Sequence, residues 1–132
     1  MRALAPSLGV GTGFEGLAVY REAAALSDDI DSAVSEWESF ARWTVGVQIV
    51  RAADSIGANI AEGYGRRTDL DRRRFLFLAR GSVCELQHWL MRARERKLSY
   101  PSGALERADE VGRMLNGLTK SWSAARARTP SD

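Results

Sequence analysis

The residues whose side chains are best suited to binding a ligand are arginines in the middle of the chain. Five of them fall within nine positions: Arg66, Arg67, Arg72, Arg73 and Arg74. A guanidinium group presents a planar fork of N–H donors that matches phosphate oxygens, so such a cluster is suited to a nucleic-acid backbone. A second, weaker group follows at Arg92, Arg94, Arg96 and Lys97. We expect both groups to contact RNA or DNA with little sequence preference and strong salt dependence.

The distribution of charge leaves a second interpretation open. Residues 1–64 hold four arginines against nine carboxylates, whereas residues 65–97 hold ten basic side chains against four carboxylates, within a net charge of only +2. This asymmetry predicts an anionic partner for the middle of the chain. Alternatively, the arginines pair with the acidic first helix, at Asp28, Asp29 and Asp31, in the same or a neighbouring subunit. Charge alone does not separate the two hypotheses.

A polar stripe on one side of a predicted helix resembles a catalytic row. It consists of Arg51, Ser55, Asn59 and Glu62. Glu62 could act as a base and Arg51 as an anion clamp, but no nucleophile–base pair accompanies them. A polar network that fixes helix register or a subunit contact is therefore favoured. One histidine and one cysteine predict no metal site, and we expect neither a cofactor nor enzymatic activity.

The elements that position these residues are predicted to be helices, because apolar residues recur with helical spacing and no segment alternates with period two. Residues 15–100 contain no proline. The expected helices run from about Glu15 to Glu36 or Glu38, from Ser39 or Arg42 to Tyr64, from an N-cap at Thr68 to about Lys97, and from about Ser102 to Ala125.

Four helices with short loops predict an all-α, up-down-up-down four-helix bundle. We expect the bundle domain to cover residues 14–125, between a flexible N-terminal tail at 1–13 and a frayed C-terminal tail at 126–132. No apolar run approaches the ~18 residues of a membrane helix. The broken N-terminal segment is unlike a signal peptide. A cytoplasmic protein without a membrane partner is expected.

The third helix is apolar on two sides. One row belongs to the predicted core: Leu76, Val83 and Leu90. The opposite row consists of Phe77, Cys84 and Met91. A chain this small has too little protein to cover both sides, so we expect oligomerisation through the second and third helices. The single cysteine lies in this apolar run, which favours a buried, inert thiol.

Aromatic side chains crowd the bend before the second helix. They are Trp37, Phe40 and Trp43. Aromatics at such a bend typically close the end of a bundle, and we expect all three to do so.

Three motifs resemble one known family. They are Phe14-x-x-Leu17-x-Val19-Tyr20, Gln48-Ile49-x-Arg51-Ala52-Ala53-x-Ser55-Ile56-x-x-Asn59-Ile60-Ala61-Glu62-Gly63-Tyr64-Gly65-Arg66, and Arg74-Phe75-Leu76-x-x-Ala79-x-Gly81-Ser82-x-x-Glu85-Leu86. Together they resemble the four-helix-bundle proteins first noticed as products of intervening sequences in bacterial 23S ribosomal RNA genes. That family includes the accessory variability determinant proteins of diversity-generating retroelements. The resemblance spans about residues 14–120.

The resemblance implies a non-enzymatic bundle that assembles as a ring-like homopentamer with a basic surface. The retroelement members bind nucleic acid and a reverse transcriptase, so the resemblance also implies these partners. The alternative is an oligomeric protein-interaction scaffold whose arginines serve subunit or protein contacts.

Overall fold

The computed structural model describes residues 13–128, and their side chains as far as residue 123. Every element in this part of the chain is helical. In chain order the elements are η2 (Phe14–Gly16), α1 (Ala18–Val34), α2 (Ser39–Ala41), the π-helical η3 (Arg42–Gly46), α3 (Val47–Tyr64), α4 (Asp69–Glu95) and α5 (Ala104–Arg128). Since α2, η3 and α3 follow one another without a break, they form the predicted second helix.

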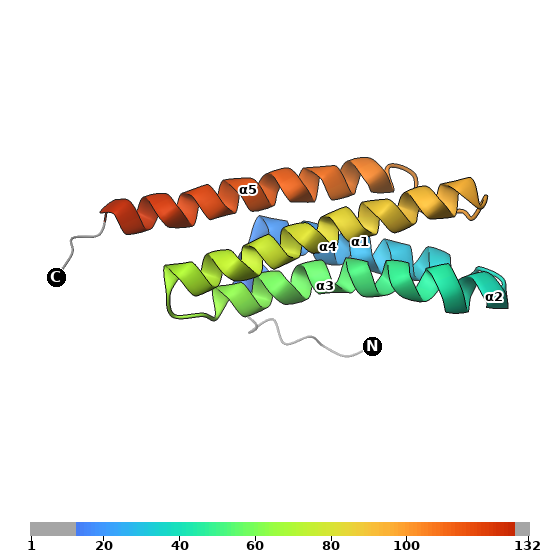
Figure 1. Ribbon diagram of the computed structural model, residues 1–132, viewed down its shortest axis with the longest axis horizontal. Helices are drawn as coiled ribbons and strands as arrows, with labels where there is room; N and C mark the ends of the chain where they lie inside the picture. The colour runs from blue at the N-terminus through green and yellow to red at the C-terminus, as the bar shows by residue number, and fades with distance from the viewer. Residues whose placement is uncertain (1–12, 129–132) are drawn as a thin grey trace.

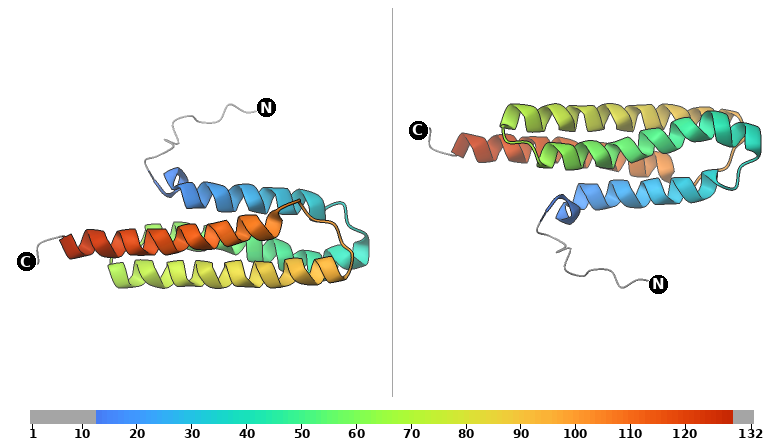
Figure 2. Two further views of the ribbon diagram at one scale, coloured as in Figure 1. Left: turned by 90° about the horizontal axis from the view of Figure 1, so that it is seen from above. Right: turned by 90° about the horizontal axis from the view of Figure 1, so that it is seen from below.

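The long helices α1, α3, α4 and α5 run alternately up and down the bundle (Figure 1). Helix α1 packs against α3 and α5, and α4 packs against the same two helices. The order around the bundle is therefore α1, α3, α4, α5, with α1 and α4 on opposite corners (Figure 2). The predicted all-helical, four-helix architecture is confirmed for the described residues.

The core is built from the apolar stripes of these helices. Ile49, Ile56 and Ile60 of α3 are fully buried, as is Leu86 of α4. The predicted core row of α4 is also buried: Leu76, Val83 and Leu90. Positions three, four or seven apart share one side of a helix, and this is why the sequence pattern locates the core.

Helix α4 begins where its cap residue predicts. The Oγ1 atom of Thr68 accepts a hydrogen bond from the backbone N–H of Asp71 at 3.1 Å. Asp71 also lies in the first turn, where a carboxylate stabilises the positive end of the helix dipole. The helix ends at Glu95, two residues before the expected position, and Lys97 follows with a positive φ of 60° that terminates the helix.

The expected tails lie largely outside the described residues. Residues 1–12 and 129–132 are not described, and Gly13 is the described part of the expected N-terminal tail. Helix α5 continues to Arg128, so residues 126–128 of the expected frayed tail are helical. No helix in the described part of the chain is both long and apolar enough to cross a membrane.

Trp37 closes one end of the bundle. It is buried, and its indole Nε1–H donates a hydrogen bond to the carbonyl oxygen of Ser99 at 2.7 Å. This bond ties the start of the second helical run to the loop between α4 and α5.

The prediction that all three aromatics at the bend fill the bundle end is wrong for Phe40 and Trp43, which are 75% and 69% exposed. The physical reason is the helical register. Ala41 and Val45 occupy the buried side of α2 and η3, which leaves the outer side to the two aromatic rings. A π-turn such as η3 inserts an extra residue and shifts this register.

Candidate nucleic-acid interface

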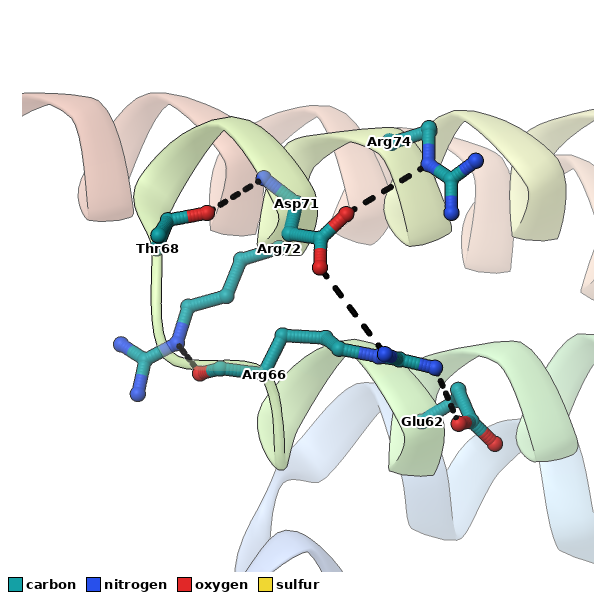
Figure 3. Close-up of polar contacts among 6 residues, drawn as sticks. All are labelled: Glu62, Arg66, Thr68, Asp71, Arg72 and Arg74. Carbon is teal, nitrogen blue, oxygen red and sulfur yellow. Dashed lines mark hydrogen bonds and ion pairs between the residues drawn. The ribbon is translucent and has the colours of Figure 1, made fainter.

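The turn between α3 and α4 lies at one end of the bundle and carries the first arginine group (Figure 1). Figure 3 shows three of these arginines, Arg66, Arg72 and Arg74. A close approach of the two helices makes this turn compact. Gly63 is buried, and a Cβ added to it would lie 3.0 Å from Cβ of Phe75 and 3.2 Å from the carbonyl oxygen of Arg72. Glycine is therefore the residue that allows α4 to fold back so tightly on α3.

Two arginines of the group are held by neighbouring side chains. The guanidinium of Arg66 contacts Glu62 at 2.7 Å and Asp71 at 3.9 Å, and it stacks over the ring of Phe75 at 4.6 Å. Arg74 contacts the other oxygen of Asp71 at 3.6 Å and also stands over Phe75. Exposed ion pairs of this kind contribute up to about 1 kcal/mol each. Their main effect is to fix the shape of the turn.

Arg67 and Arg72 leave guanidinium donors available. Arg67 is exposed, and it has no ion pair or hydrogen bond with any described side chain. The Nε atom of Arg72 donates to the carbonyl oxygen of Arg66 at 2.8 Å, and its guanidinium stands 5.6 Å from the ring centre of Trp122. Figure 3 shows the two terminal nitrogens of Arg72 pointing away from the other residues drawn.

Arg73 reaches towards α5. Its Nη1 atom donates to the Oγ atom of Ser123 at 3.4 Å, a long hydrogen bond to a neutral partner. None of Arg67, Arg72 and Arg73 forms an ion pair with a carboxylate among the described residues. Within the described part of the chain, three positive charges around one helix start are therefore not compensated by direct ion pairs.

The acidic first helix does not neutralise these arginines within one chain. Asp29 instead pairs with Arg107 of α5 at 2.9 Å. Asp28 and Asp31 are exposed and form no ion pair with any described residue. The geometric reason is that α1 and α4 occupy opposite corners of the bundle. The alternative prediction, in which these aspartates pair with the arginine group, therefore survives only for pairing between neighbouring subunits.

The second basic group lies at the far end of α4. Arg94, Arg96 and Lys97 are exposed, and Arg92 is half-buried. Helix α4 has 27 residues, so at 1.5 Å per residue the two groups are separated by roughly 30–40 Å. They form two patches at opposite ends of the bundle and do not merge into one surface.

The polar stripe of α3 is divided among different contacts. The hydroxyl groups of Ser55 and Ser82 are hydrogen bonded at 2.9 Å, which joins α3 to α4 within the chain. Asn59 donates from Nδ2 to the carbonyl oxygen of Ser55 at 2.9 Å. Arg51 is exposed at the surface, and Glu62 is used by the α3–α4 turn. The stripe therefore supplies an intrachain helix contact at its centre.

The second apolar row of α4 faces outward. Phe77 is 59% exposed and Met91 is 44% exposed. Cys84 is a free, exposed cysteine, so the predicted buried thiol is wrong for the single chain. Cys84 follows Val83 directly, so it lies about 100° around the helix from the buried row. None of the other described helices covers this side well enough to bury Phe77, Cys84 or Met91. Among the described residues, no group of three or more His, Cys, Asp or Glu side chains is placed to hold a metal ion.

Sequence reasoning missed the contribution of α5 to this end of the bundle. Trp122 and Ser123 contact Arg72 and Arg73, although they lie about fifty residues away in the sequence. The predicted bundle topology could have indicated this contact. In an up-down-up-down bundle, the end of the fourth helix lies beside the start of the third, as Figure 1 shows for α5 and α4.

Comparison with known proteins identifies the family. The family model described as 23S rRNA-intervening sequence protein matches residues 15–117, which is most of the chain and almost all of the described bundle. No curated protein matches the chain. The match covers α1, α3, α4 and the basic α3–α4 turn, together with the first half of α5. The chain therefore belongs to the family of 23S rRNA-intervening sequence proteins.

Proposed function

We propose that the chain is a non-enzymatic nucleic-acid-binding protein that assembles as a homopentamer and contacts the phosphate backbone of RNA or DNA. The observation that carries the proposal is the α3–α4 turn, where Arg67, Arg72 and Arg73 lack a carboxylate partner among the described residues. Arg66 and Arg74 have a supporting role, because their contacts with Asp71 hold the turn in shape.

The chemistry of these groups suits backbone contact. Each guanidinium can donate two parallel hydrogen bonds to phosphate oxygens, and such contacts carry no base information. Three contacts from one chain are weak individually. Repetition of the turn in an assembly of identical chains would raise the overall affinity, since later contacts become intramolecular.

The outward apolar row of α4 supports assembly. Phe77 and Met91 together with Leu70, which is 71% exposed, form an apolar strip that a monomer would leave in water. The family match concerns proteins of ribosomal RNA intervening sequences, which is consistent with an RNA context. The resemblance to accessory variability determinant proteins extends the proposal to a reverse transcriptase as protein partner.

Single charge-removing substitutions test the site. Arg67→Gln and Arg73→Gln should each weaken binding of a fluorescently labelled, structured RNA, measured by anisotropy. Loss of one phosphate contact reduces the slope of the logarithm of the association constant against the logarithm of salt concentration by roughly 0.7–0.9. This corresponds to about a five- to eightfold loss of affinity at 0.1 M salt. Arg21→Gln is the matched control, because Arg21 is an exposed arginine of α1 without an ion pair among the described residues. Equal effects of all three substitutions would refute the assigned site.

A second candidate function is a protein-interaction scaffold without a nucleic-acid role. The exposed apolar strip of α4 favours it, because such strips commonly mark protein contacts. The same titration separates the two functions. A scaffold would assemble normally yet bind no RNA at low salt, and Arg67→Gln would change nothing.

A further inference from the structure

We propose that the groove between α1 and α3 binds the outward face of α4 from a second copy of the chain, so that neighbouring copies contact head to tail. The inference rests on the proposed assembly of identical chains and specifies which two surfaces meet. It assigns an occupant to the groove and a function to the carboxylates of Asp28 and Asp31, which form no ion pair among the described residues.

The groove consists of two hollows that lie along α1 and α3. One has a volume of about 360 Å³ and the other of about 450 Å³, and Asp54 lines both. Small residues form the walls of the first hollow, notably Ala24, Gly57 and Ala58. Exposed Trp43 borders the apolar floor of the second. Walls made of small side chains allow another helix to approach closely.

The outward face of α4 has the shape that such a groove requires. Its apolar side chains recur every seven residues along one line: Leu70, Phe77, Cys84 and Met91. Gly81 lies on the same face, and open space surrounds the position of its missing Cβ. The line from Leu70 to Met91 covers 21 intervals, or roughly 32 Å, and the 18 residues of α3 extend roughly 27 Å. The ridge and the groove are therefore similar in length.

The charges on the two surfaces are opposite. Asp28 and Asp31 line the groove and have no ion pair among the described residues, and Asp54 accepts a hydrogen bond from Ser27. The ridge of α4 is flanked by the exposed side chains of Arg74 and Arg80.

An ion pair of the opposite polarity, with the cation in the groove and the carboxylate beside the ridge, can also form. Arg51 lines the groove, and Glu85 is exposed beside the ridge. Arg42, the remaining cation of the groove, is held by the carbonyl oxygen of Ser35 at 3.5 Å. Ion pairs across such a contact would set its orientation.

This charge pattern favours a second copy over the other occupants. A phosphate backbone would meet the carboxylates of Asp28, Asp31 and Asp54, so nucleic acid is disfavoured in this groove. A symmetric contact between two α4 helices would bring the exposed Arg80 side chains towards each other. Since α4 lies diagonally across the bundle from α1, the two surfaces face different directions, and each copy offers both. Contacts of this heterologous type close into rings or extend into filaments.

A mixing experiment tests the pairing. Phe77→Asp blocks the ridge with a carboxylate that the acidic groove repels, and Ala58→Asp places a carboxylate inside the groove. Both original side chains are exposed, so the fold should survive. We expect the wild-type chain to form a multimer in analytical ultracentrifugation and each variant alone to sediment as a monomer of 14.5 kDa. Each variant retains one intact surface, so an equimolar mixture should form a complex of two chains and no larger species.

Circular dichroism and thermal melting verify that the variants are folded. Asn116→Asp, at an exposed position of α5, is the matched control and should leave the multimer intact. A multimer that persists in Phe77→Asp or Ala58→Asp would overturn the pairing while leaving the proposed assembly in place. Two monomeric variants that fail to associate when mixed would also overturn it. A monomeric wild-type chain would overturn the assembly and the pairing together.

Discussion

Gly46 lies at the end of the π-turn that leads into α3, and its replacement by alanine should destabilise the chain. An added Cβ would lie 2.7 Å from Cγ1 of Val34, 3.3 Å from the carbonyl oxygen of Ala41 and 3.6 Å from the ring of Trp37. Relief of this overlap requires movement of a buried β-branched side chain, and overpacking of this kind costs about 1–3 kcal/mol. Alanine regains about 1 kcal/mol through its better helix propensity. We expect a net loss of about 1 kcal/mol.

Gly117→Ala is the matched control for this prediction. Gly117 is an exposed position inside α5, and no atom lies within 4 Å of the place where a Cβ would be added. The same substitution should therefore stabilise the chain by about 0.5–1 kcal/mol. Thermal denaturation should show the two melting temperatures moving in opposite directions, by roughly 2–5 °C each. Both variants are compared at one protein concentration, because assembly makes the melting temperature concentration-dependent. Equal stabilisation by both substitutions would refute the packing argument at Gly46.

Three further substitutions, with one surface control, test the fold by chemical denaturation. Thr68→Ala should lower the free energy of unfolding by about 1 kcal/mol, because it removes the hydrogen bond that caps α4; an unchanged midpoint would show that the cap is dispensable. Leu86→Ala should lower it by about 2–5 kcal/mol, since Leu86 is fully buried, whereas Lys120→Ala at an exposed position should stay within about 0.5 kcal/mol. Trp37→Phe should lower it by about 1–2 kcal/mol through loss of the hydrogen bond to Ser99. A change below 0.3 kcal/mol would contradict the assigned closing role of this residue, by the same hydrogen-bond scale.

The helices were predictable because local signals and the core pattern agree. Thr68 caps α4 as its side chain predicts, and the helical spacing of Ile49, Ile56 and Ile60 places them in the core. The outward direction of Phe77 and Met91 also follows from their spacing relative to the buried row. These features depend on residues close together in the sequence, where one helical period fixes the side on which each lies.

Features that depend on distant residues were less predictable. The pattern places Cys84 in an apolar run, but whether that run is covered depends on the other helices, and those that the structure describes leave Cys84 exposed. The direction of Phe40 and Trp43 likewise depends on packing, because Ala41 and Val45 take the side of α2 and η3 that faces the core. Asp29 pairs with Arg107, nearly eighty residues later. Which arginines form ion pairs and which leave their guanidinium groups available also depends on where Glu62, Asp71 and α5 lie in the fold.

The most direct test of the central claim is a salt titration of RNA binding by the wild-type chain. Dissociation constants for a structured RNA are measured between 50 and 200 mM salt and plotted on logarithmic axes. Three phosphate contacts, from Arg67, Arg72 and Arg73, predict that the logarithm of the association constant falls with a slope of about −2 to −3 for each engaged chain. Absence of binding at 50 mM salt, or binding with a slope near zero, would contradict a function based on this arginine-rich turn.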